Sequence, residues 1–291
     1  MVIASAIFFG AMPIFAKLAY NGGTDAVGLL MARFLASGLI LVSALRLSRG
    51  HFPDPKKRGL PLLVLLALFS SQSFCYFASV EQNGAVTATL LLYTYPLLTT
   101  VVSTMFFAES FGFLKGCALV TGFIGVAFSI NGFSASFSSV GLLTGIGSSV
   151  LFTATMLLAK RILGKHGDAS EMMALLYVGS APLFLLAFFA SGASLPDALG
   201  GWAALAGVVL LGTVAAMGLF FAGLDRLPAG TAGMLSSLEP AIAVVLAAIF
   251  LAEPIALIQA VGVVLVVGSI LMLTRLDPED EKVGPAPSDP V

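Results

Sequence analysis

Glu239 is the only charged residue in the apolar segment Ala229–Ala252. A charged side chain at the centre of a membrane-spanning helix costs roughly 2.5–3.5 kcal/mol on insertion scales, so this carboxyl group should have a partner or a function. It can contact an ammonium group of a small molecule or take up a proton. Alternatively, a protonated or hydrogen-bonded Glu239 stabilises a helix break beside Pro240. Both interpretations remain open.

Other polar side chains interrupt two further apolar segments. Gln72 and Tyr76 are four residues apart, so they share one helix face. They can hydrogen-bond a carboxylate or an amine, or stack on a ring. Hydrogen bonds between helices, which contribute about 0.6 kcal/mol each on average, explain them equally well. The candidate cavity residues are Gln72, Tyr76, Thr94, Tyr95, Ser237 and Glu239, and Tyr93 and Ser236 are weaker candidates.

Two prolines, Pro96 and Pro240, lie inside apolar segments. Each proline removes one helical hydrogen bond and clashes with the carbonyl group four residues earlier. The freed carbonyl groups of Leu92 and Ser236 can point into a cavity, because irregular backbone at membrane depth needs protein or water around it. We therefore expect hinges at both prolines. A static kink that helps packing is the alternative.

Other kinds of chemistry find no support in the sequence. The histidines His51 and His166 lie in polar connections, and Cys75 and Cys117 lie in apolar stretches, so neither a zinc site nor a disulfide framework is expected. No HExxH, GxSxG or GxxxxGK[ST] motif occurs. We therefore predict that the chain is not an enzyme and uses no metal or cofactor.

The composition indicates that the solvent around these residues is lipid. Of the 291 residues, 58% are hydrophobic and 10% are charged, against roughly 25% charged in soluble domains. A spanning helix needs roughly 20 apolar residues. Ten segments satisfy this condition: Val2–Tyr20, Asp25–Leu47, Gly59–Val80, Gly84–Phe107, Phe111–Ile130, Val140–Leu163, Ala169–Gly192, Gly201–Leu224, Ala229–Ala252 and Pro254–Arg275.

The positive charges predict the orientation, because cytoplasmic loops are enriched in lysine and arginine. With ten spans, one side of the membrane would hold Arg46, Arg49, Lys56, Lys57, Arg58, Lys115, Lys160, Arg161, Lys165, Arg226, Arg275 and Lys282. The other side would hold at most Lys17. We therefore place both termini in the cytoplasm. The net charge of −1 gives no indication of nucleic-acid binding.

The chain repeats itself at a spacing of 144 residues. Residues 85–109 match residues 229–253 at nine of 25 positions, with Pro96 on Pro240 and Glu109 on Glu253. The chain thus divides into halves of five helices, 1–135 and 136–275, followed by an acidic tail, 276–291, that we expect to be disordered. Because five is odd, the second half would be inverted, as in many carriers.

These features together resemble a known family. The Ala-Glu pairs at 108–109 and 252–253, the proline within each preceding helix, Glu239-Pro240 and Arg33-Phe34 look like the EamA-type branch of the drug/metabolite transporter superfamily. Within it, length and aromatic content most resemble the YddG-type aromatic amino acid exporters. The resemblance implies a central cavity lined by helices 1, 3, 4, 6, 8 and 9, with helices 5 and 10 at the periphery.

The resulting prediction is an all-α protein of the bacterial inner membrane, built as a five-plus-five inverted repeat around a central cavity. It would export small organic solutes, foremost aromatic or neutral amino acids, by alternating access. A weakly charged, aromatic cavity also suits organic cations or nucleosides, and argues against phosphorylated sugars. A membrane assembly subunit without transport activity is the alternative from another class. The expected partners are a small-molecule substrate and the lipid bilayer.

Overall fold

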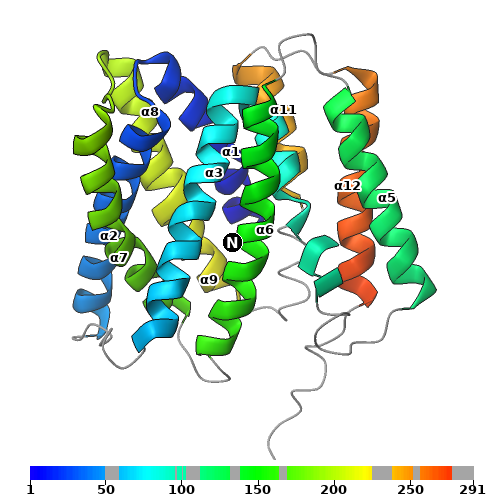
Figure 1. The fold of residues 1–291 in the computed structure, drawn as a ribbon, viewed down its shortest axis with the longest axis horizontal. Helices are drawn as coiled ribbons and strands as arrows, with labels where there is room; N and C mark the ends of the chain where they lie inside the picture. Colours follow the sequence, from blue (N-terminus) through cyan, green and yellow to red (C-terminus); the bar gives the residue numbers. More distant parts are fainter. Residues whose placement is uncertain are drawn as a thin grey trace, which may run out of the picture.

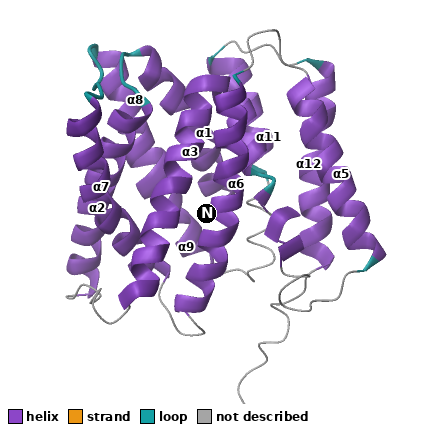
Figure 2. Cartoon of the chain, in the orientation of Figure 1, coloured by secondary structure: helices purple, strands orange, loops and turns teal. Residues whose placement is uncertain are grey.

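The computed structural model describes residues 1–49, 59–95, 97–99, 101–102, 112–131, 138–163, 169–224, 238–251 and 256–276. These residues are helical apart from short turns, and they contain no β-strand (Figure 2). Six helices in this part of the chain are long and apolar enough to cross a membrane, and three shorter apolar helices accompany them. The prediction of an all-α membrane protein is confirmed at this level.

The helices follow the apolar segments closely. In chain order they are α1 (Val2–Asn21), α2 (Ala26–Arg49), α3 (Gly59–Leu92), α5 (Phe113–Asn131), α6 (Ser139–Leu163), α7 (Ala169–Ser191), α8 (Leu199–Val209), the π-helical turn η2 (Leu210–Ala215), α9 (Ala216–Leu224), α11 (Glu239–Phe250) and α12 (Leu257–Leu276). The elements α8, η2 and α9 follow one another without a break, so they form one apolar span with a π turn in its middle.

The 34-residue α3 contains a sharp change of direction at Gly84. Gly84 has φ 83° and ψ 170°, a backbone conformation that is open to glycine and strained for other residues. The predicted boundary between the third and fourth segments falls at this residue. The preceding Asn83 holds the corner against the start of α6: its amide donates to the Ser138 carbonyl at 3.0 Å and accepts from the Ser138 N–H at 2.9 Å.

The helices pack in pairs that are distant in the sequence (Figure 1). Helix α2 packs against α7, α3 against α6, and α5 against α12, and the last pair lies at one edge of the molecule, on the right of Figure 1. Helix α1 contacts α8, η2, α9 and α11. Its position brings the first helix of the chain against the second half.

The largest apolar core joins α1, α2, α3, α7 and α8. An aromatic group forms its centre: the Phe34 ring stacks on Phe184 with centroids 4.8 Å apart, and it lies 5.0 Å from Tyr177 and 5.6 Å from Phe69. Aromatic pairs in such arrangements stabilise a fold beyond the area they bury. A separate, smaller cluster joins α11 and α12 to Ala85, Val86 and Leu90 of α3, and it also includes Ile14 of α1.

Candidate functional site

A phenol from the first half of the chain and a carboxylate from the second half meet beside α3 and α11. The Tyr93 hydroxyl donates a hydrogen bond to the Glu239 carboxylate. Tyr93 lies in the turn that follows α3, and Glu239 is the first residue of α11, with Leu238 as the N-cap residue. The sequence predicted Glu239 near the middle of a helix, whereas among the described residues it begins one. A carboxylate at this position interacts favourably with the positive end of the helix dipole.

Pro240 follows Glu239 in the first turn of α11 and is buried. Proline suits this position because the N–H group that it lacks has no helical acceptor there. Helix α1 comes very close at this point: a Cβ atom on Gly10 would lie 3.1 Å from the Glu239 carbonyl oxygen and 3.2 Å from the Ala243 nitrogen. The predicted hinge Pro96 and the predicted cavity residue Ser237 lie outside the described residues.

Tyr95 places a second aromatic ring beside the Tyr93–Glu239 pair. Its ring lies 5.9 Å from the Tyr93 ring in a tilted arrangement, and 4.6 Å from the Phe152 ring of α6, edge to face. Aromatic faces attract cations, and a carboxylate beside them adds a full negative charge. Two rings and one carboxylate therefore make an environment that suits an organic ammonium group.

Thr94 bridges α3 to α6. Its hydroxyl donates to the Leu91 carbonyl at 2.8 Å and lies 2.6 Å from the Ser149 hydroxyl, which is buried. Because the Thr94 proton is used on Leu91, Ser149 donates to Thr94. The predicted cavity residue Thr94 thus has its hydroxyl group fully engaged within the protein.

Hydroxyl groups also satisfy the backbone near Pro96. The Tyr95 carbonyl oxygen accepts from Thr99 at 2.8 Å. The Thr153 hydroxyl of α6, which donates to the Ser149 carbonyl at 3.0 Å, lies 3.4 Å from the same oxygen. The backbone of Tyr93–Thr94 forms a turn, with the Thr94 N–H on the carbonyl three residues earlier, at Leu91. Sequence reasoning expected an irregular backbone here, and it missed Ser149 and Thr153, the α6 residues that stabilise it.

Gln72 and Tyr76 both lie buried in α3, 6% and 4% exposed. The Tyr76 hydroxyl lies 3.3 Å from the Thr89 hydroxyl, which itself donates to the Ala85 carbonyl at 2.7 Å. Tyr76 is therefore the donor to Thr89. The Gln72 carbonyl oxygen accepts a long hydrogen bond of 3.4 Å from Ser73. Tyr76 thus joins the two helical parts of α3 across the Gly84 corner.

Arg33 is buried in α2, with 6% of its surface exposed. Its Nε atom donates to the Thr213 hydroxyl at 3.0 Å, and its Nη2 atom donates to the Tyr177 hydroxyl at 2.7 Å. Both partners are neutral hydroxyl groups, one from η2 and one from α7. The sequence marks Arg33 as a candidate because a charge in an apolar segment is unusual, but it does not identify Thr213 and Tyr177 as the partners of this residue.

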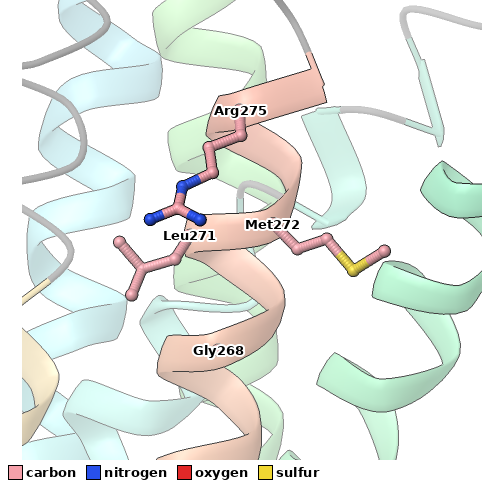
Figure 3. Close-up of a pocket in the computed structure, with 4 residues that line it drawn as sticks. All are labelled: Gly268, Leu271, Met272 and Arg275. Carbon is pink, nitrogen blue, oxygen red and sulfur yellow. The ribbon is translucent and has the colours of Figure 1, made fainter.

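A cavity of about 350 Å³ lies beside α12. The described residues that line it are Gly268, Leu271, Met272 and Arg275, and the side chains of Leu271 and Arg275 point to one side of α12 while Met272 points to the other (Figure 3). The predicted cavity residues are not among them. In the described part of the chain, no group of three His, Cys, Asp or Glu side chains is placed to hold a metal ion.

Three curated bacterial proteins resemble the chain along most of its length. The uncharacterized transporter YvbV of Bacillus subtilis is 29% identical over 267 residues, covering 89% of this chain and 84% of its own. The uncharacterized transporter YetK of the same organism is 25% identical, covering 88% and 84%. The threonine/homoserine exporter RhtA of Salmonella typhimurium is 25% identical, covering 89% and 86%.

The fold also occurs among solved structures. One crystal structure superposes with a TM-score of 0.66 at 19% sequence identity, covering 96% of this chain and 98% of the other. The sequence model of the EamA-like transporter family matches residues 1–131 and 139–275. These matches extend over nearly all of the apolar segments, and the relatives with curated names are transporters. The chain is a multi-pass membrane protein that belongs to the EamA-like transporter family.

Proposed function

We propose that the protein exports small organic solutes, foremost neutral and aromatic amino acids, from the bacterial cytoplasm by alternating access. The observation that carries the proposal is the hydrogen bond from Tyr93 to Glu239. It joins the two halves of the chain, at the turn that follows α3 and at the first residue of α11. In carriers built from inverted repeats, substrate and coupling-ion sites lie at helix interruptions near the bilayer midplane.

Contacts between α5 and α12 support the inverted five-plus-five repeat. A Cβ atom on Gly122 would meet the Ser269 hydroxyl at 2.7 Å, and a Cβ atom on Gly125 would meet the Val266 nitrogen at 2.8 Å. Adding 144 to 122 gives 266, and subtracting 144 from 269 gives 125. Each contact is thus the repeat equivalent of the other with the two halves exchanged, as a two-fold relation between halves 1–135 and 136–275 requires.

The membrane orientation is part of the proposal. In the ten-span arrangement, both termini and the basic connections lie on the cytoplasmic side of the inner membrane, by the excess of lysine and arginine there. The turn between α1 and α2 and the turn between α7 and α8 then lie on the outer side, where they contact each other through Thr24 and Ser194 at 2.8 Å.

The chemistry beside Glu239 supports an amino acid as substrate. The carboxylate of Glu239 suits the ammonium group, and the rings of Tyr93 and Tyr95 suit an aromatic or aliphatic side chain. Gln72, Tyr76, Thr94 and Ser237 complete the proposed cavity, with Pro96 and Pro240 as proposed hinges. The likeness to RhtA, a threonine/homoserine exporter, supports the same class of substrate.

An organic cation is the second candidate substrate, because the same carboxylate and two rings attract any quaternary or protonated amine. An amino acid also carries a carboxylate, which needs a donor. The Gln72 amide is the donor that we assign to this role. Replacement of Gln72 would therefore weaken amino acid transport while leaving transport of a simple cation unchanged.

The test is counterflow of labelled phenylalanine into proteoliposomes preloaded with unlabelled phenylalanine, with and without a pH gradient. We expect uptake that tyrosine, tryptophan, methionine or threonine competes away, and that Glu239→Gln reduces. Sensitivity to the pH gradient that is lost in Glu239→Gln would assign proton coupling to this residue. Absence of uptake by folded protein, together with uptake of a labelled organic cation, would replace the amino acid by the cation as the substrate.

A further inference from the structure

Arg33 is a buried cation whose described partners are all neutral. Its acceptors are the hydroxyl oxygens of Thr213 and Tyr177, and its guanidinium carbon lies 5.1 Å from the centre of the Phe77 ring, 5.4 Å from that of Tyr177 and 5.8 Å from that of Phe34. A guanidinium ion within an apolar core is costly unless its donors are satisfied. The hydroxyl groups and ring faces compensate for the burial of this charge, so the stability of the buried guanidinium ion depends on the position of each of them.

Thr213 lies inside the π turn η2 and takes part in two hydrogen bonds. Its hydroxyl donates to the Val208 carbonyl five residues earlier, at 2.9 Å, and its oxygen accepts from Arg33 Nε. A π turn is a one-residue expansion of an α-helix that is rare and concentrated at functional sites. The Thr213 side chain therefore links the five-residue spacing of this turn directly to the cation in α2.

The π turn determines which face of α9 meets α1. Before the turn, Gly207 packs on the Phe15 ring: a Cβ atom on Gly207 would lie 2.8 Å from that ring. After the turn, a Cβ atom on Gly223 would lie 2.4 Å from the Val2 side chain. An α-helix rotates by about 100° per residue, so loss of the extra residue of the π turn would turn Gly223 away from Val2 while Gly207 stays in place.

Helix α1 connects the rotation of α9 to the start of α11. Ser5 donates to the Ala216 carbonyl at 2.7 Å, immediately after the π turn. One and a half turns further along α1, Gly10 lies against the Glu239 backbone. The position of α1 against α9 therefore sets its position against the residue that accepts the Tyr93 hydrogen bond.

We infer that Arg33 is a positioning residue for transport: by donating to Thr213 and Tyr177 it maintains the π turn, and through that turn it sets how α9 and α11 pack on α1. Arg33 acts through helix geometry rather than by contact with the substrate. The effect on transport rests on the proposed function, whereas the effect on helix register does not.

Disulfide cross-linking tests the register. In a chain carrying Cys75→Ala and Cys117→Ala, the pair Val2→Cys with Gly223→Cys reports the contact after the turn. The pair Phe15→Cys with Gly207→Cys reports the contact before it and serves as the control. In each pair the Cβ position of the glycine lies close to a side-chain atom of its partner, 2.4 Å from Val2 and 2.8 Å from Phe15. Both pairs are expected to form in the chain with Arg33 and Thr213 intact.

The variants are Arg33→Gln and Thr213→Val, with Thr213→Ser as the matched control that keeps the hydroxyl group. In the first two we expect cross-linking of the pair after the turn to fall at least fivefold, with the pair before the turn unchanged. In Thr213→Ser both pairs form. Equal formation of both pairs in Arg33→Gln would overturn the inference. Loss of both pairs would also overturn it, because Arg33 would then support the whole fold rather than this turn.

The transport readout separates positioning from substrate contact. In phenylalanine counterflow, Arg33→Lys should lower the maximal rate at least tenfold and change KM less than twofold, because lysine cannot reach both hydroxyls with a planar fork. A raised KM with an unchanged maximal rate would instead make Arg33 a substrate contact and overturn the inference. If the unaltered protein transports no phenylalanine, the proposed substrate fails while the cross-linking result still decides the role of Arg33.

Discussion

Arg33 donates a hydrogen bond of 2.7 Å to Tyr177, and the two residues are 144 positions apart, the spacing at which the sequence repeats. Two halves related by a two-fold axis bring a residue against its own equivalent only near that axis. The contact thus places the centres of α2 and α7 beside the axis of the proposed repeat. The α5–α12 contacts, which exchange under the same shift of 144, agree with this position.

The Tyr93–Glu239 hydrogen bond is expected to be required for transport. Tyr93→Phe keeps the ring and removes the donor to the carboxylate. Hydrogen bonds to charged groups contribute about 1.5–3 kcal/mol, so we expect the counterflow rate to fall by roughly tenfold or more. Tyr95→Phe is the control, because the ring contacts of Tyr95 with Tyr93 and Phe152 do not need its hydroxyl. Equal rates in the two variants would contradict the assigned role of Tyr93.

The hydrogen bond between Thr94 and Ser149 is expected to stabilise the α3–α6 contact. Thr94→Val and Ser149→Ala should each lower the melting temperature in detergent, and the double variant should lower it by less than the sum. The non-additive part reflects the bond itself, about 0.6 kcal/mol for an average hydrogen bond between membrane helices. Additive effects would show that the 2.6 Å contact contributes nothing of its own.

Gly125 is expected to tolerate no side chain. A Cβ atom there would lie 2.8 Å from both the Gly262 oxygen and the Val266 nitrogen, and these backbone atoms cannot rotate away. Gly125→Ala should therefore force α5 and α12 apart and cost about 1–3 kcal/mol, measured as a lower melting temperature. Gly268→Ala on α12, with no described atom within 4 Å of the new methyl group, is the control and should melt at or slightly above the original temperature.

Asp25 is expected to stabilise the turns at the end of the molecule where α1 meets α2. One carboxylate oxygen accepts from the Gly28 N–H at 2.8 Å, and the other accepts from the Ser194 N–H at 2.9 Å. Asp25→Ala loses both bonds and should cost about 1–2 kcal/mol. Asp25→Asn keeps one acceptor oxygen, so its melting temperature should lie between those of the original protein and of Asp25→Ala. A melting temperature of Asp25→Asn equal to that of Asp25→Ala would mean that one oxygen alone contributes nothing.

Local features of the sequence determined the apolar helices and several of their ends. Helix α1 ends at Asn21, one residue after the predicted Tyr20, and α7 ends at Ser191, one residue before the predicted Gly192, because glycine residues follow at both places. The corner at Gly84 was also predictable, since glycine alone accepts its backbone conformation. Family membership followed from short motifs, and the family match confirms it.

Tertiary packing decided which side chains meet. The repeat aligns Glu239 with Tyr95, yet Tyr93 makes the hydrogen bond, because the turn at Tyr93–Thr94 changes the direction in which successive side chains point. Likewise, the sequence marks Arg33 as a charge in an apolar helix but does not identify its partners, Thr213 and Tyr177, which lie 180 and 144 residues away. Such pairs depend on the rotation of each helix about its axis, and packing against several neighbours at once sets that rotation.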